Sequence, residues 1–213
     1  MPIKIKICGI TNYDDAKNAV SLGVDALGFI FYQKSPRFIH PIAARDIIRK
    51  LPPFVAKVGV FVDDTEETIQ AVFGQTGIDT VQLHGSETPE FAHRLSCAVV
   101  KAFAVKSGFD VGALSQYQVA GYLLDTWSDT PGVHGGSGKT FDWSIAKDAT
   151  RRYPNIILAG GLNPANIREA LENVQPYAVE FNSGVEIKPG VKNHYKMRDA
   201  VAIVKNWNAV SGK

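Results

Sequence analysis

Two side chains that can exchange a proton end predicted β-strands far apart in the chain. Cys8 closes segment 3–8, in which isoleucines alternate with polar residues, a period typical of a two-faced strand. Lys6 lies two residues earlier on the same face, and a neighbouring cation favours a reactive thiolate over the inert thiol of many free cysteines. Asp125 closes the apolar segment 121–125. A carboxylate there could cap a loop, but a carboxylate that points inward at the mouth of a parallel-stranded barrel more often belongs to a functional site.

Glycine-bearing turns follow each of the last three predicted strands. They occupy residues 135–138, 160–161 and 183–184. Glycine lets backbone N–H groups approach an anion closely, and the loops after strands seven and eight are the usual phosphate site of a (β/α)₈ barrel. Any one of these glycines could simply make a tight turn, but the three turns together favour phosphate binding. The candidate phosphate contacts are Gly136, Gly160, Gly161, Ser183 and Gly184.

Three further residues are ambiguous by themselves. His84 ends the predicted strand 79–84, where a structural histidine and a ligand contact are equally expected. Arg37 lies in the polar loop 33–38 and would by itself be interpreted as solvated surface. Cys97 precedes a strand and is interpreted as an inert thiol.

Eight short predicted strands alternate with helical segments and position these side chains. The strands are 3–8, 26–31, 55–62, 79–84, 98–104, 121–125, 155–159 and 177–181. Five helical segments are 12–21, 42–50, 64–75, 111–117 and 143–151, and the segment 64–75 has a capping box of Asp64 and Glu67. Of three further helical segments, one is capped by Thr88, one is opened by Asn163, and one contains 197–207. This alternation predicts parallel βαβ units and a single-domain (β/α)₈ barrel over residues 1–213. An open doubly wound sheet is the alternative, and it would require two of the strands to be wrong.

The composition excludes several classes of protein. Of 213 residues, 45% are hydrophobic, which is enough for a large core, and the net charge of +2 is too small to indicate a nucleic-acid or membrane-surface partner. The two cysteines have no metal-site spacing and indicate no disulfide framework. No apolar run approaches the roughly 18 residues of a membrane span, and no signal-peptide pattern is present. We therefore expect a reduced, cytoplasmic protein.

Eight motifs, in chain order, resemble those of phosphoribosylanthranilate isomerases. They are Lys-Ile-Cys-Gly-Ile-Thr at 6–11, Gly-Phe-Ile-Phe at 28–31, Ser-Pro-Arg at 35–37, Val-Gln-Leu-His-Gly at 81–85, Leu-Asp at 124–125, Gly-Gly-Ser-Gly-Lys at 135–139, Leu-Ala-Gly-Gly-Leu at 158–162 and Asn-Ser-Gly-Val-Glu at 182–186. The resemblance covers nearly the whole chain. It implies a (β/α)₈ barrel that isomerises N-(5-phosphoribosyl)anthranilate in tryptophan biosynthesis by an Amadori rearrangement, with no metal or organic cofactor. The implied partner is this small-molecule substrate, and we expect a monomer.

The resemblance also implies roles for single residues. Cys8 matches the general base, Asp125 the general acid, and Arg37 the arginine that binds the anthranilate carboxylate. Gln82 and His84, in the motif at 81–85, are expected to contact the substrate. We expect the positive charge of Lys6 to lower the pKa of the Cys8 thiol.

The last strand departs from the family pattern. Where Asp-Val-Ser-Ser-Gly is expected, the chain has Glu-Phe-Asn-Ser-Gly at 180–184, and Glu180 is therefore left out of the expected catalytic residues. Because the last strand of a closed barrel lies beside the first, Glu180 is expected to face Lys4 and Lys6 and to pair with a buried lysine.

Two other classes of protein stay open. A related sugar-phosphate barrel enzyme, such as a histidine-pathway aminoaldose isomerase, would be expected to have an aspartate in place of Cys8. A non-catalytic barrel that binds a phosphate ligand would need neither Cys8 nor Asp125.

Overall fold

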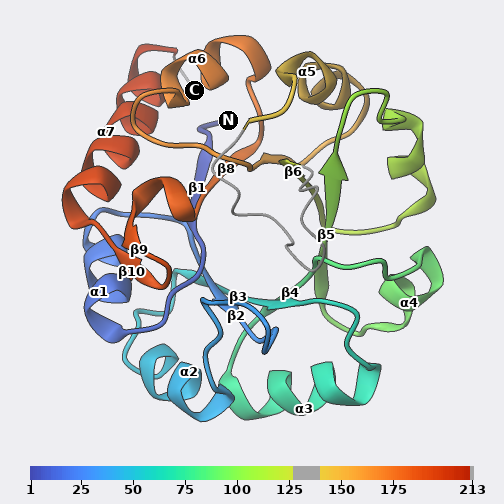
Figure 1. The fold of residues 1–213 in the computed structure, drawn as a ribbon, viewed down its shortest axis with the longest axis vertical. Coiled ribbons are helices and arrows are strands. Elements are labelled where there is room, and N and C mark those ends of the chain that lie inside the picture. The colour runs from blue at the N-terminus through green and yellow to red at the C-terminus, as the bar shows by residue number, and fades with distance from the viewer. Residues whose placement is uncertain (127–139, 212–213) are drawn as a thin grey trace.

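The computed structural model describes residues 1–126 and 140–211, and its centre is a closed barrel of eight parallel strands (Figure 1). The strands are β1 (Lys4–Ile7), β2 (Ala26–Ile30), β3 (Ala56–Phe61), β4 (Thr80–Leu83), β5 (Ala98–Val105), β6 (Gly121–Thr126), β7 (Ile156–Leu158) and β8 (Ala178–Phe181). Neighbours in sequence are neighbours in the barrel, and β8 pairs with β1 to close it. The predicted fold class is confirmed, and the open sheet is excluded.

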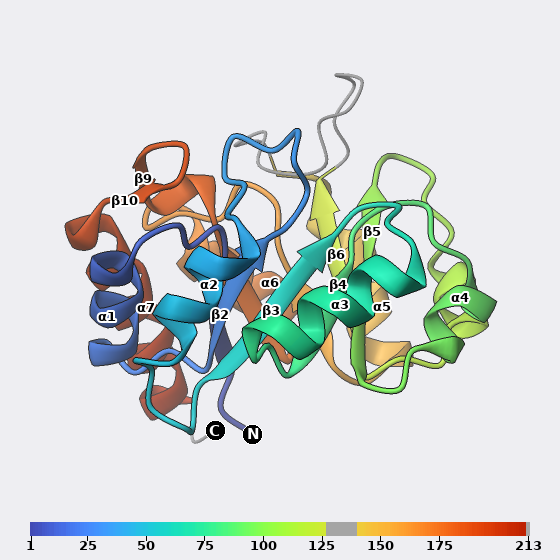
Figure 2. The ribbon, with the colours of Figure 1, turned by 90° about the horizontal axis from the view of Figure 1, so that it is seen from below.

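Helices surround the barrel on its outside (Figures 1 and 2). They are α1 (Tyr13–Ser21), α2 (Pro41–Ile48), α3 (Glu66–Thr76), α4 (Pro89–Arg94), α5 (Trp143–Arg152), α6 (Ile167–Val174) and α7 (His194–Val210), with a 3₁₀ helix, η1 (Val111–Gln116), between β5 and β6. Each predicted helical segment therefore has a helix, although that at 111–117 is a 3₁₀ helix.

Two helices, α3 and α6, begin later than predicted. In α3 the Thr65 hydroxyl, not Asp64, accepts the N–H of Thr68 at 3.2 Å. Before α6, the side chain of Asn166 accepts the N–H of Asn163 at 2.9 Å, and this bond closes a turn before the regular helix starts. Asn163 does open this turn as predicted, since its side chain accepts the N–H of Ala165 at 2.9 Å. Only at α3 does another polar residue take the free N–H group.

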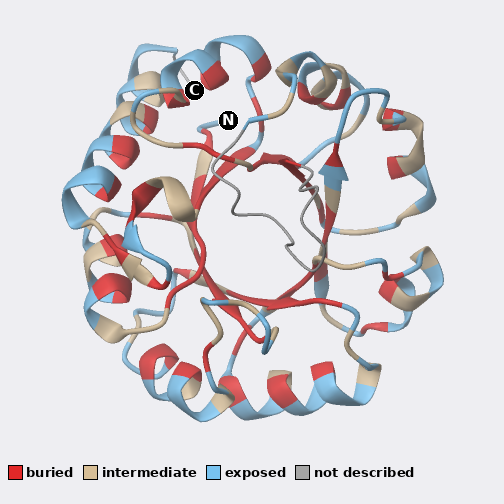
Figure 3. Cartoon of the chain, in the orientation of Figure 1, coloured by how far each residue is buried: buried red, intermediate tan, exposed pale blue. Residues whose placement is uncertain are grey.

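The apolar core has two main parts, and a third, smaller cluster consists of Cys8, Ile30 and Val60. The larger part lies between the barrel and the helices, where Ile5 and Ile7 of β1 are buried, and Figure 3 shows the buried residues along the strands and the inner helix faces. The smaller part fills the barrel interior and consists of Ala102, Leu123, Ile157, Ala159 and Ala178. Lys6 and Cys8 are on the other face of the β1 segment, as its alternation predicts.

Strand pairing places Glu180 directly beside Lys6. The two residues are partners in the β1–β8 register, and the Lys6 ammonium group contacts the Glu180 carboxylate. Their side chains are only 7% and 6% exposed. The expected buried pair is confirmed for Lys6, whereas Lys4 pairs with Asp25 at 2.8 Å in a more exposed position.

A short hairpin after β8 was not predicted. The 3₁₀ helix η2 (Ser183–Val185) leads into β9 (Glu186–Lys188) and β10 (Val191–Lys192), which pair antiparallel. Figure 2 shows the hairpin at the end of the barrel opposite to both chain termini. In the part of the chain that the structure describes, no helix has the length and apolar character needed to cross a membrane.

The buried Lys6–Glu180 pair predicts a large effect of Glu180→Gln on stability. The substitution leaves a buried ammonium group without its counter-charge, so the free energy of unfolding should fall by about 3 kcal/mol at pH 7. Urea denaturation measures this change. Asp148→Asn, which breaks the exposed Asp148–Arg152 pair, is the control and should cost about 0.5 kcal/mol or less. Equal effects of the two substitutions would show that Lys6 does not depend on Glu180.

Candidate active site

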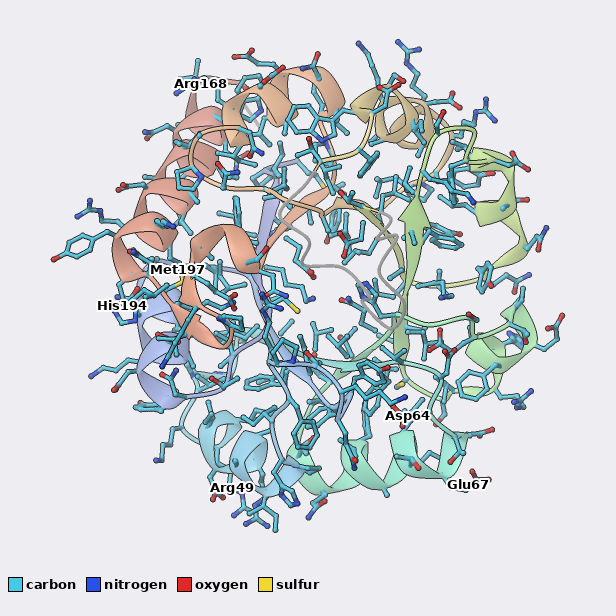
Figure 4. All side chains as sticks on the ribbon, in the orientation of Figure 1. Arg49, Asp64, Glu67, Arg168, His194 and Met197 are labelled. Carbon is cyan, nitrogen blue, oxygen red and sulfur yellow. The ribbon has the colours of Figure 1, made fainter. Side chains whose placement is uncertain are left out.

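A cavity of about 330 Å³ opens at the carboxyl ends of the strands. Nine of the ten predicted site residues line it: Cys8, Arg37, Gln82, His84, Asp125, Gly160, Gly161, Ser183 and Gly184. The tenth, Gly136, lies outside the described residues. By contrast, the exposed charged side chains of Arg49, Glu67 and Arg168 lie on the outer rim of the molecule (Figure 4). The structure therefore brings the predicted residues together from six strands and their loops.

Cys8 lies just beyond the end of β1 and is 2% exposed. Its N–H donates to the carbonyl of Phe181 at 2.9 Å, which holds the residue in line with the barrel wall. A Cβ atom at Gly28 on the neighbouring strand would lie 2.6 Å from the Cys8 sulfur atom. Glycine at position 28 therefore makes room for the thiol.

The pKa of the Cys8 thiol is raised to about 11, contrary to the expected lowering. Burial is the largest cause, and the negative charge of Glu180 adds to it. Lys6 and Lys192 act in the opposite direction but do not outweigh these two effects. The expectation from sequence considered Lys6 without the carboxylate that neutralises it. The free protein therefore holds Cys8 as a thiol at neutral pH.

A chain of polar contacts runs from Lys6 to Asp125 across the cavity. Lys6 donates to the Gln82 carbonyl oxygen Oε1 at 2.7 Å, and this contact orients the Gln82 amide. The amide nitrogen of Gln82 then lies 2.9 Å from Nδ1 of His84, while Nε2 of His84 lies 3.4 Å from the Asp125 carboxylate. Because an amide N–H can only donate, this network assigns the His84 hydrogen to Nε2, facing Asp125. Gln82 and His84 thus connect the interior lysine to the predicted acid.

Asp125 is held by its own strand end. One carboxylate oxygen, Oδ1, accepts the N–H of Thr126 at 2.7 Å, and the residue is 5% exposed. The same oxygen would lie 3.0 Å from a Cβ atom at Gly160, where φ is +84°. The Gly160 turn therefore packs closely over the carboxyl group and needs glycine for both space and conformation.

The turns after β7 and β8 pack against each other at the cavity. A Cβ atom at Gly184 would lie 2.0 Å from the carbonyl oxygen of Leu162, so the two turns touch through backbone atoms. Gly161 has φ +65° and lines the cavity. Within residues 1–126 and 140–211, its N–H donates to no acceptor. An anion with several oxygens could accept such a donor.

Arg37 is not solvated surface, although its loop suggested that interpretation. Its side chain is 11% exposed and pairs with Glu186 of β9, with Nη2 at 2.8 Å from Oε2. Glu186 in turn contacts Lys192 of β10 at 2.8 Å. Sequence reasoning missed these two residues, although the Pro189–Gly190 dipeptide is a turn signal that could have indicated the hairpin.

The pKa of the Cys8 thiol can be tested by alkylation. In a Cys97→Ser background, the rate constant with iodoacetamide should rise about tenfold per pH unit from pH 7 to pH 10, because only the thiolate reacts. Glu180→Gln should shift this curve to lower pH, since it removes a negative charge near the sulfur atom. A plateau below pH 9 in the parent protein would mean that Lys6 and Lys192 dominate instead.

Comparisons with known proteins agree with this geometry. Residues 5–203 match the family model of N-(5'-phosphoribosyl)anthranilate (PRA) isomerase. An N-(5'-phosphoribosyl)anthranilate isomerase of Trichlorobacter lovleyi is 47% identical over 203 residues, 95% of this chain and 98% of the relative. The phosphoribosyl anthranilate isomerase structure from Thermotoga maritima is 44% identical with a TM-score of 0.89, covering 96% of this chain and 99% of that chain. Another phosphoribosyl anthranilate isomerase structure, in complex with reduced 1-(o-carboxyphenylamino)-1-deoxyribulose 5-phosphate, is 40% identical with a TM-score of 0.86 over 96% and 99%. The chain belongs to the N-(5'-phosphoribosyl)anthranilate isomerase family.

Proposed function

We propose that the protein converts N-(5-phosphoribosyl)anthranilate to 1-(2-carboxyphenylamino)-1-deoxyribulose 5-phosphate, with Asp125 as the general acid and Cys8 as the general base. The observation that most supports these roles is that both side chains line one cavity, from β6 and β1. A proton donor and a proton acceptor on different sides of a bound sugar can act on two of its atoms.

In the first step, Asp125 donates its proton to the furanose ring oxygen. The bond between this oxygen and C1 breaks as the nitrogen lone pair forms a C1=N bond, which leaves a cationic iminium ion. Cys8, as a thiolate that has released its own proton to solvent, then removes the proton from C2. The electrons of the C2–H bond form a C1=C2 double bond, and those of the C1=N π bond return to the nitrogen. The resulting enol becomes the ketone when C1 gains a proton and the C2 hydroxyl loses one. The rearrangement is redox-neutral, and each step moves a proton, so this mechanism uses no metal or organic cofactor.

The iminium ion helps to explain how a thiol with a raised pKa can serve as a base. Burial and Glu180 disfavour the Cys8 thiolate in the free protein. A cation formed on the substrate beside the sulfur atom favours the thiolate and opposes both effects. We therefore place the loss of the thiol proton, to solvent through the cavity mouth, after ring opening, when the base is needed.

The rest of the cavity matches the rest of the substrate. The turns with Gly160, Gly161, Ser183 and Gly184 offer backbone N–H groups to the phosphate, and the Gly136 loop is proposed to contribute to the same site. Arg37 offers a guanidinium group to the aryl carboxylate. The apolar side chains of Ile30, Tyr32 and Val60, which pack around Cys8, also line the cavity and suit the aromatic ring.

We also propose that residues 1–213 act as one domain, as a monomer, and in the cytoplasm. These three statements rest on the sequence. Sedimentation equilibrium tests the monomer, and a concentration-dependent increase in mass would contradict it.

The acid–base roles predict the effects of two conservative substitutions. Cys8→Ser and Asp125→Asn should each lower kcat by about 10²–10⁴-fold, because neither replacement can transfer its proton in the required step. Both variants should bind the reduced product analogue with a dissociation constant close to that of the parent. Cys97→Ser is the control and should keep full activity. Near-parental turnover by Cys8→Ala would show that the thiol is a bystander.

The phosphate site predicts a selective loss of affinity in Gly161→Val. A side chain there blocks the backbone approach, and the φ of +65° disfavours any β-branched residue. Titration calorimetry should give about tenfold weaker binding of a phosphate-bearing product analogue. Gly74→Val is a suitable control, since within the described residues a Cβ atom at that position would have no atom within 4 Å apart from its own helix backbone and chain neighbours. An unchanged affinity in a folded Gly161→Val variant would place the phosphate elsewhere.

A further inference from the structure

The β9–β10 hairpin supplies a buried ion pair that holds Arg37 from one side. Arg37 Nε lies 3.0 and 3.1 Å from the two carboxylate oxygens of Glu186, and Nη2 lies 2.8 Å from Oε2. Glu186 Oε1 also accepts from Lys192 Nζ at 2.8 Å and from the Gly190 N–H at 3.2 Å. The Glu186 and Lys192 side chains are 4% and 0% exposed. The guanidinium group is therefore clamped along its Nε–Nη2 edge.

The contact with Glu186 leaves the Nη1–Nη2 edge of the Arg37 guanidinium group available for a ligand. A guanidinium group has five N–H donors, and Glu186 uses the one on Nε and one of the two on Nη2. No acceptor in the described part of the chain takes an N–H of Nη1. The Nη1–Nη2 edge presents two parallel donors, the arrangement that matches a carboxylate. Since Arg37 also lines the cavity, one guanidinium group can hold Glu186 and a bound carboxylate at the same time.

Lys192 determines the net charge of the cluster formed by Arg37, Glu186 and Lys192. Its ammonium group contacts Glu186 Oε1 at 2.8 Å, the Asn182 side-chain oxygen at 3.0 Å and the Asn182 carbonyl at 3.4 Å. Arg37, Glu186 and Lys192 together carry one net positive charge. The pKa of Glu186 is lowered, because the hydrogen bond from Arg37 and the charge of Lys192 outweigh the effect of burial. Without Lys192, the Arg37–Glu186 pair would be neutral and would attract an anion only weakly.

We propose that Glu186 and Lys192 are positioning residues that make Arg37 selective for a substrate with an aryl carboxylate. Glu186 fixes the direction of the guanidinium group, and Lys192 compensates the charge of Glu186 so that the charge of Arg37 remains for the ligand. This inference rests on the proposed function, in which Arg37 binds the anthranilate carboxylate.

The test compares two reduced product analogues, one with the aryl carboxylate and one with hydrogen in its place. Glu186→Asp keeps the charge but is one methylene too short for the clamp, and Lys192→Met removes the compensating charge. Each should weaken binding of the carboxylate analogue about tenfold in calorimetry and change binding of the other analogue less than twofold. Equilibrium affinities are used because Lys192 also acts on the pKa of Cys8 and could change kcat by that route.

Three further variants complete the design. Arg37→Lys should reduce the affinity difference between the two analogues, and adding Glu186→Asp to Arg37→Lys should cause no further loss. Lys188→Met is the matched control, since Lys188 is exposed on the same hairpin. Circular dichroism and urea denaturation establish that each variant is folded. If Lys192→Met does not fold, Glu186→Asp alone tests the positioning role.

The outcomes separate the inference from the function on which it rests. If Arg37→Lys removes the preference for the carboxylate but the Glu186 and Lys192 variants keep it, the positioning role is wrong and the site stands. If Arg37→Lys also keeps the preference, Arg37 does not bind the carboxylate. Both the positioning role of the hairpin residues and the proposed role of Arg37 are then wrong. Equal losses of both analogues in the hairpin variants would indicate a general distortion of the cavity and would also overturn the positioning role.

Discussion

The buried ammonium group of Lys6 is the constraint on which the barrel interior depends. A charge in the interior of a protein needs partners that offset its lost hydration, and Lys6 finds them on β8 and β4. Glu180 supplies the counter-charge, and Gln82 supplies a carbonyl oxygen. Because Gln82 must turn that oxygen toward Lys6, its amide nitrogen faces His84, and His84 faces Asp125. One cation thus determines the orientation of side chains on three other strands.

The Lys6–Glu180 pair that stabilises the barrel also makes the Cys8 thiol harder to ionise. Glu180 stabilises Lys6, but its negative charge also helps to raise the pKa of the nearby thiol. A barrel that neutralised Lys6 less completely would ionise Cys8 more easily and would bury an uncompensated charge. Functional sites commonly carry such conflicts between folding and chemistry. In the mechanism that we propose, the iminium ion of the substrate would add the missing positive charge.

Much of the fold was accessible from the sequence because its signals are local. Alternation in β1, apolar runs in the other strands and glycine turns after the last three predicted the eight strands and the common end of the barrel at which Cys8 and Asp125 lie. The start of α3 was wrong because adjacent polar residues compete for the same N–H groups, and Thr65 rather than Asp64 makes the bond. The raised pKa of Cys8 was missed because the expectation weighed only the positive charge of Lys6, whereas burial and the negative charge of Glu180 outweigh it.

The hairpin shows a second limit of sequence reasoning. Strands of three and two residues are too short for a periodic pattern, so Glu186 and Lys192 gave no signal of their own. Their importance comes from contact with Arg37, which is 149 residues away from Glu186 in the chain. The motif at 182–186 contains Glu186, but a motif alone does not say which partner a carboxylate holds.

The position of the chain ends has a practical consequence. Met1 and the end of α7 both lie at the amino-terminal end of the barrel, on the far side from the β9–β10 hairpin and the cavity mouth (Figure 2). An affinity tag, a sensor surface or a fused protein attached at either end would extend away from the mouth. The enzyme can therefore be immobilised or built into an artificial multienzyme particle with its entrance facing the solution.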